Sequence, residues 1–128
     1  MIAMAKTTQS EKPVTKDQKM AQTAYDCVVN RKGDKNFNFD DYSNFAYAFP
    51  TLIHSCGLAQ AMAFASAKGK GDYVADLQAV FDQVDKAGDL RERSRKAPLP
   101  EYTRISRHAL AAASWLKRYC QAEDKAGK

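Results

Sequence analysis

The chain has 128 residues, with 20 Lys and Arg against 15 Asp and Glu, and its formal net charge is +5. A chain of this length forms one domain that buries about two-thirds of its unfolded surface without needing a metal or a disulfide. No apolar run approaches the roughly 20 residues of a membrane span, and the N-terminus lacks the basic-then-apolar order of a signal peptide, so we expect a soluble, cytoplasmic protein.

Residues 1–14 are polar and show no apolar periodicity, which predicts a mobile N-terminal tail. Thr15 followed by Gln18 has the pattern of a capping box, in which the side chain of each residue accepts a hydrogen bond from the backbone N–H of the other. A helix should begin there and end at Gly33 and Asp34. Its apolar face would consist of Met20, Ala24, Cys27 and Val28.

A second helix should begin at Asp40 or Asp41, either of which can cap it. Its buried stripe would consist of Tyr42, Phe45, Ala46 and Phe49. Pro50 is expected to end this helix, because proline lacks the backbone N–H that a helix interior needs. Residues 50–56 then read as a short helical turn restarted at an angle, and Gly57 should stop it.

An alanine-rich helix is predicted over residues 58–67, followed by a flexible basic turn over 68–71 that contains Lys68 and Lys70. Asp72 should cap the next helix. Its apolar face would consist of Tyr73, Leu77, Val80, Phe81 and Val84, and three carboxylates should face outward: Asp76, Asp82 and Asp85.

Residues 86–100 are polar and contain Gly88, Pro98 and Pro100, which predicts a connecting loop that a partner could order. Its basic cluster consists of Arg91, Arg93, Arg95 and Lys96.

A long helical pattern over residues 102–123 has two faces about its axis. The apolar face consists of Ile105, Ala109, Ala112, Leu116 and Tyr119. The basic stripe consists of Arg104, Arg107, His108, Trp115 and Arg118. The first can close a core and the second can lie along a polyanion, although charges on a helix are also often simply solvated.

No alternating strand pattern appears, so the sequence predicts an all-α fold: a compact bundle of five to six helices in a single domain. We expect this domain to span residues 15–124, with residues 125–128 fraying at the C-terminus.

The sequence offers no convincing catalytic constellation, and we expect neither an enzyme nor a bound metal or cofactor. Three cysteines lie far apart without Cys-x-x-Cys spacing, so they should be reduced thiols. His54 and Cys56 form the one close pair of potential ligands, interpreted as a partly exposed imidazole beside a buried thiol. His108 is expected among arginines, in a surface contact.

Three blocks of sequence carry a resemblance to a known family: Phe49-Pro50-Thr51-Leu52-Ile53, the run Gly-Leu-Ala-Gln-Ala-Met-Ala-Phe at 57–64, and Ala-Ser-Trp-Leu-Lys-Arg-Tyr at 113–119. They resemble the small helical subunit of the Cmr complex, the type III-B CRISPR effector, which is an RNA-guided antiviral assembly. The resemblance covers most of residues 21–123 in order and spacing.

The resemblance implies a non-catalytic subunit that stacks in several copies as a filament. Its partners would be other Cmr subunits, including the large polymerase-like one, and the backbones of guide RNA and target RNA. By the same resemblance Lys117 and Arg118 match a terminal basic pair, whereas Pro50, Gly57 and Leu58 match structural positions.

The charge pattern adds four candidate RNA contacts to that pair: Lys68, Lys70, Arg104 and Arg107. Residues 1–39 contain 7 basic and 4 acidic side chains, 40–89 contain 3 and 7, and 90–128 contain 10 and 4, giving net charges of +3, −4 and +6. Such a distribution suits contact with a polyanion on one side and with proteins on another. Two alternatives stay open: a helical adaptor that binds only proteins, and an unrelated small enzyme.

Overall fold

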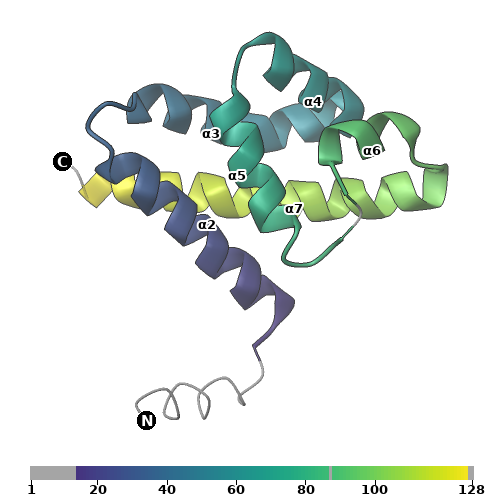
Figure 1. The fold of residues 1–128 in the computed structure, drawn as a ribbon, viewed down its shortest axis with the longest axis horizontal. Coiled ribbons are helices and arrows are strands. Elements are labelled where there is room, and N and C mark those ends of the chain that lie inside the picture. Colours follow the sequence, from purple (N-terminus) through teal and green to yellow (C-terminus); the bar gives the residue numbers. More distant parts are fainter. Residues whose placement is uncertain (1–13, 87, 127–128) are drawn as a thin grey trace.

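The computed structural model describes residues 14–86 and 88–126, and these form six α-helices without a strand (Figure 1). The helices are α2 (Lys16–Gly33), α3 (Phe39–Cys56), α4 (Leu58–Ala67), α5 (Gly71–Phe81), α6 (Leu90–Lys96) and α7 (Leu99–Ala126). The predicted all-α bundle is therefore confirmed. The predicted tail, residues 1–14, lies almost wholly outside the described residues.

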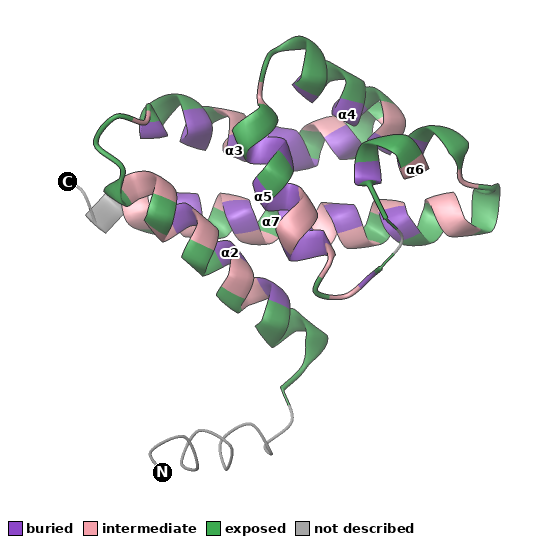
Figure 2. Cartoon of the chain, viewed as in Figure 1, coloured by how far each residue is buried: buried purple, intermediate pink, exposed green. Residues whose placement is uncertain are grey.

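Helix α7 is the central element, and α2, α3, α5 and α6 all pack on it (Figure 1). Its 28 residues span about 42 Å. Buried positions recur along its length, as Figure 2 shows, and include four of the five residues of the predicted apolar face: Ile105, Ala109, Ala112 and Leu116. Tyr119, the fifth, is only half-buried. Alanines on this face let the neighbouring helices approach closely.

The predicted capping box at the start of α2 is confirmed. The Gln18 N–H donates to Thr15 Oγ1 at 3.0 Å, and the Thr15 N–H donates to Gln18 Oε1 at 2.8 Å. Helix α3 begins differently from the prediction, because Asn38 is its cap and accepts from the Asp41 N–H at 3.0 Å. Asp40 and Asp41 instead lie in the first turn, where their charge stabilises the helix dipole.

Helix α3 runs through Pro50 without ending there, so the predicted break is wrong. An internal proline costs roughly 3 kcal/mol or more. Pro50 is itself buried and lies between buried Phe49 and Ile53, each of which contributes about 1.5–3 kcal/mol through burial. Core packing on both sides thus offsets the lost hydrogen bond. The predicted stop at Gly57 is confirmed, with φ +87° and its N–H donating to the Ile53 carbonyl at 2.8 Å.

Two further predictions about local structure were wrong. Asp72 lies in the first turn of α5, whose N-cap is Lys70 without a side-chain cap bond. Residues 90–96, predicted as part of a loop, form helix α6. Its cap Asp89 accepts from the Glu92 N–H at 3.1 Å, and its one buried apolar residue, Leu90, anchors it to the core. Seven residues with one apolar anchor are too few to show a helical period.

Asp76 was predicted to face outward, but it is buried between α2, α3 and α5. Arg31 holds it with two hydrogen bonds, of 3.0 and 3.1 Å, and the Tyr42 hydroxyl donates to Oδ2 at 2.5 Å. Burial and then the Asp76 charge raise the pKa of Tyr42, which therefore stays a donor. The Asp76 carboxylate therefore links α5 to α2 through Arg31 and to α3 through Tyr42.

Among the described residues, no helix combines the length and the apolar character needed to cross a membrane.

Candidate nucleic-acid interface

The basic stripe of α7 divides into two edges with different surroundings. On the outer edge, Arg107 and Arg118 are exposed and have no ion-pair partner among the described residues. They are eleven positions apart in the chain, which places them within about 20° on the helix and about 16 Å apart along its axis. These two cations therefore point the same way and are free to meet an anion.

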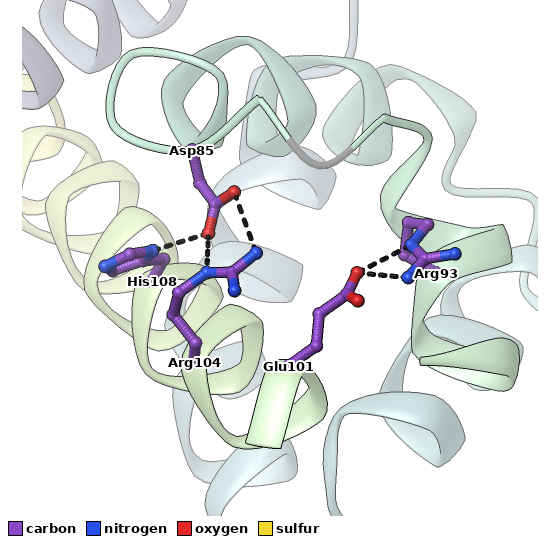
Figure 3. A network of polar contacts seen from close by, with 5 residues as sticks. All are labelled: Asp85, Arg93, Glu101, Arg104 and His108. Atoms are coloured by element: carbon purple, nitrogen blue, oxygen red, sulfur yellow. Dashed lines mark hydrogen bonds and ion pairs between the residues drawn. The ribbon is translucent and has the colours of Figure 1, made fainter. Parts of the chain in front are cut away.

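The inner edge of the stripe consists of Arg104 and His108, and both contact a carboxylate of the same chain. Asp85, which follows α5, lies 3.0 Å from Arg104 Nε and 2.8 Å from His108 Nδ1 (Figure 3). The predicted outward position of Asp85 is wrong, since its side chain is only 7% exposed. His108, expected among arginines, shares this carboxylate oxygen with Arg104. Arg104 is thus already neutralised.

The pKa of Asp85 reflects these contacts. Burial disfavours the charged carboxylate, but the hydrogen bonds from Arg104 and His108 outweigh it, and the pKa is lowered from its ordinary value of 3.8. A second pair nearby, Arg93 with Glu101, joins α6 to the first turn of α7 with Nε 2.9 Å from Oε2 (Figure 3). The contacts of Asp85 hold the segment after α5 against α7, and the Arg93–Glu101 pair holds α6 against α7.

Replacing Asp85 by Asn should lower the free energy of unfolding by about 1–3 kcal/mol at neutral pH, because charge-assisted hydrogen bonds are lost. A folded-state pKa below the unfolded value means that this stabilisation is present above pH 3.8 and is lost as the pH falls through the folded pKa. Denaturant unfolding of parent and variant should therefore converge in acid. Asp26→Asn, at an exposed site in the middle of α2, should change stability little at any pH and so show no such convergence; for the Asp85 variant, a constant difference from the parent down to pH 2 would contradict the assignment.

Lys68 and Lys70 lie in the turn between α4 and α5, on the part of the molecule away from α7 (Figure 1). Lys70 Nζ lies 2.5 Å from Asp41 Oδ2 and is therefore paired. Lys68 is exposed, with its Nζ 5.6 Å from the centre of the Phe64 ring. The structure does not bring these lysines together with the α7 arginines.

Lys117 is partly buried and has no ion-pair partner among the described residues, and it lies about 100° around the helix from Arg118. Trp115, on the predicted stripe, stacks on Tyr119 with ring centres 5.9 Å apart and is half-buried. Four of the six candidate cations, Lys68, Arg107, Lys117 and Arg118, thus lack an ion-pair partner among the described residues, but only the two arginines share one exposed face.

Sequence reasoning missed two further exposed cations, Arg91 and Arg95 of α6, as candidate contacts. They are four residues apart, the spacing that places side chains on one face of a helix. This spacing is visible in the sequence, but it indicates a shared face only if the segment is a helix, and the segment was interpreted as a loop.

The thiols and histidines form no reactive pair among the described residues. Burial raises the pKa of Cys27 to about 12 and that of Cys120 to about 11, so both stay protonated. Cys56 and His54 are both exposed, which corrects the expected buried thiol. No group of three or more His, Cys, Asp or Glu side chains suited to a metal occurs in the described part of the chain.

Comparisons with known proteins agree with the three sequence blocks. The family model described as CRISPR-associated protein (Cas_Cmr5) matches residues 16–123. A protein of Thermus thermophilus named CRISPR system Cmr subunit Cmr5 is 39% identical over 111 residues, covering 84% of this chain and 95% of the relative. The crystal structure of a CRISPR-associated Cmr5 family protein from Thermus thermophilus superposes with a TM-score of 0.73 at 37% identity, over 85% of this chain and 97% of that one. The chain belongs to the Cmr5 family of CRISPR-associated proteins.

Proposed function

We propose that this chain is a non-catalytic small subunit of a type III-B CRISPR Cmr complex, and that it helps to hold guide and target RNA in antiviral defence. Membership of the Cmr5 family, and a relative named as a Cmr subunit, support the place in the complex. The partners in this proposal are the other Cmr subunits, including the large polymerase-like one, and stacked copies of the chain itself.

The observation that carries the RNA contact is the pair of free arginines on α7. Arg107 and Arg118 are exposed, share one face and have no carboxylate partner among the described residues. Guanidinium groups bind phosphate oxygens through several parallel donors, without reading base sequence. A surface of this kind suits a guide–target duplex, which a protein recognises by its backbone and shape.

Reversing both charges, Arg107→Glu with Arg118→Glu, should weaken target RNA capture by the assembled complex at physiological salt. Each reversal replaces an attraction for phosphate by a repulsion. Stability should change by only about 0.5 kcal/mol per site, because both side chains are exposed. The matched control is Lys16→Glu with Lys19→Glu, the same change in charge at two exposed positions of α2. RNA capture and thermal melting are measured for parent and both variants.

Capture by the arginine variant equal to that of the parent would instead favour the helical adaptor that binds only proteins. The observation that favours this second function is that Lys70 pairs with Asp41 and Arg104 pairs with Asp85 within the chain. These pairs show that positive charge on this chain also stabilises the fold.

A further inference from the structure

A pocket of about 250 Å³ lies between α4 and α6, outside the α7 face. Its α4 wall includes Ala59, Ala63 and Ser66, and the opposite wall includes Arg91 and Arg95 of α6 and the cap residue Asp89. Figure 1 shows the two helices next to each other, with α6 between α4 and the start of α7. The pocket is thus formed where the segment predicted as a loop folds back onto the bundle.

The charges of α6 separate into paired and unpaired cations. Arg93 is bound to Glu101, and Lys96 Nζ lies 2.8 Å from Glu92 Oε2. Arg91 and Arg95 have no carboxylate partner among the described residues, and they are the α6 cations that line the pocket. The unpaired charge of α6 is therefore concentrated at this pocket.

The geometry of the two arginines suits one bound group. Side chains four residues apart lie about 5–6 Å from each other at Cβ on one helix face. Arg95 Nη1 donates to the Arg91 carbonyl at 3.1 Å, which restrains its guanidinium against the helix. The remaining donors of both guanidinium groups are available to oxygens that enter the pocket.

The opposite wall allows a chain to approach closely. Ala59 and Ala63 are small, and the Ser66 hydroxyl adds a neutral donor. One carboxylate, Asp89, also lines the pocket, but its Oδ2 accepts from the Glu92 N–H at 3.1 Å as the helix cap. With two guanidinium groups against this one carboxylate, the lining stays net positive and favours an anion.

Size and donor type indicate which anion. Small-molecule sites usually occupy about 300–1,000 Å³, so this pocket suits part of a longer polymer more than a whole free nucleotide. One arginine fork can satisfy a single carboxylate, whereas two forks at one rim match the non-bridging oxygens of a phosphodiester backbone. We propose that the α4–α6 pocket binds a backbone phosphate of RNA through Arg91 and Arg95; the inference rests on the proposed RNA contact and adds a second point of attachment to it.

The test replaces the two pocket arginines, Arg91→Gln with Arg95→Gln, in the assembled complex. RNA affinity should fall for every sequence tried, and the slope of log affinity against log salt should become shallower by roughly 0.7, the value for the one phosphate contact of a single strand that is lost. The conservative variant Arg91→Lys with Arg95→Lys keeps the charge and should retain most of the slope. Lys16→Gln with Lys19→Gln is the matched control and should behave like the parent.

Other outcomes separate this inference from the proposed function. Suppose that the pocket variant binds RNA with the affinity and salt slope of the parent, whereas the Arg107 and Arg118 variant loses RNA affinity. This result would overturn the inference about the pocket and leave the proposed function standing. No effect of either variant would overturn both. Reduced incorporation of the pocket variant into the complex, with parent-like RNA affinity in the complexes that do form, would show that the pocket contacts protein and would overturn the inference as well.

Discussion

Leu116→Asp is expected to unfold the subunit. Leu116 lies at the centre of α7 with 0% of its surface exposed, and it packs in the same core as Ile105 and Ala112. The substitution removes a burial contribution of about 2–5 kcal/mol and places a carboxylate without a partner in apolar surroundings, which costs several kcal/mol more. The total is comparable with the whole stability of a typical domain, which is about 5–15 kcal/mol.

Circular dichroism and thermal melting would measure this effect directly. The matched control is Leu99→Asp, the same substitution at the first residue of the same helix, where the leucine is 76% exposed. It should change stability by about 0.5 kcal/mol or less. A Leu116→Asp protein that melts cooperatively within a few degrees of the parent would contradict the central position of α7.

Asp76→Asn is expected to have the next largest effect. The substitution keeps the shape of the side chain but leaves part-buried Arg31 with only the exposed Asp72, 3.9 Å away, as a counter-charge, and Tyr42 loses a charged acceptor. Breaking a buried pair by removing one partner typically costs about 3–5 kcal/mol. Because Arg31 keeps 27% of its side chain exposed, we expect a value near the lower end, measured by denaturant unfolding.

Asp72→Asn provides the matched control on the same helix. Asp72 lies 3.9 Å from the same arginine, but its side chain is 62% exposed, so its loss should cost less than about 1 kcal/mol. A second check removes both charges together, as Arg31→Met with Asp76→Leu, which should recover part of the stability lost in the single variant. Equal costs for Asp72→Asn and Asp76→Asn would show that burial of the pair contributes nothing.

The features that the sequence determined correctly depend on residues close together along the chain. The apolar positions of α7 recur at helical spacing, the capping box joins residues three apart, and Gly57 ends α3 through its own φ. The family, too, was recognised from contiguous blocks of sequence, and the match over residues 16–123 confirms it. Each of these signals is local, so a one-dimensional pattern contains it in full.

The tertiary structure decided whatever depends on distant partners. Pro50 stays within α3 because buried neighbours offset its cost, and α6 forms because one leucine and one cap hold a short segment against the bundle. Pattern reasoning placed Asp76 and Asp85 outward because carboxylates are usually solvated.

The same distant contacts decide which cations are free to bind RNA. Arg104 meets Asp85 across 19 residues and Lys70 meets Asp41 across 29, so both are neutralised within the fold. Arg107 and Arg118 meet no carboxylate among the described residues. An ion pair forms only where folding brings two side chains within about 4 Å, and that distance is set by the packing of all six helices, not by spacing in the sequence.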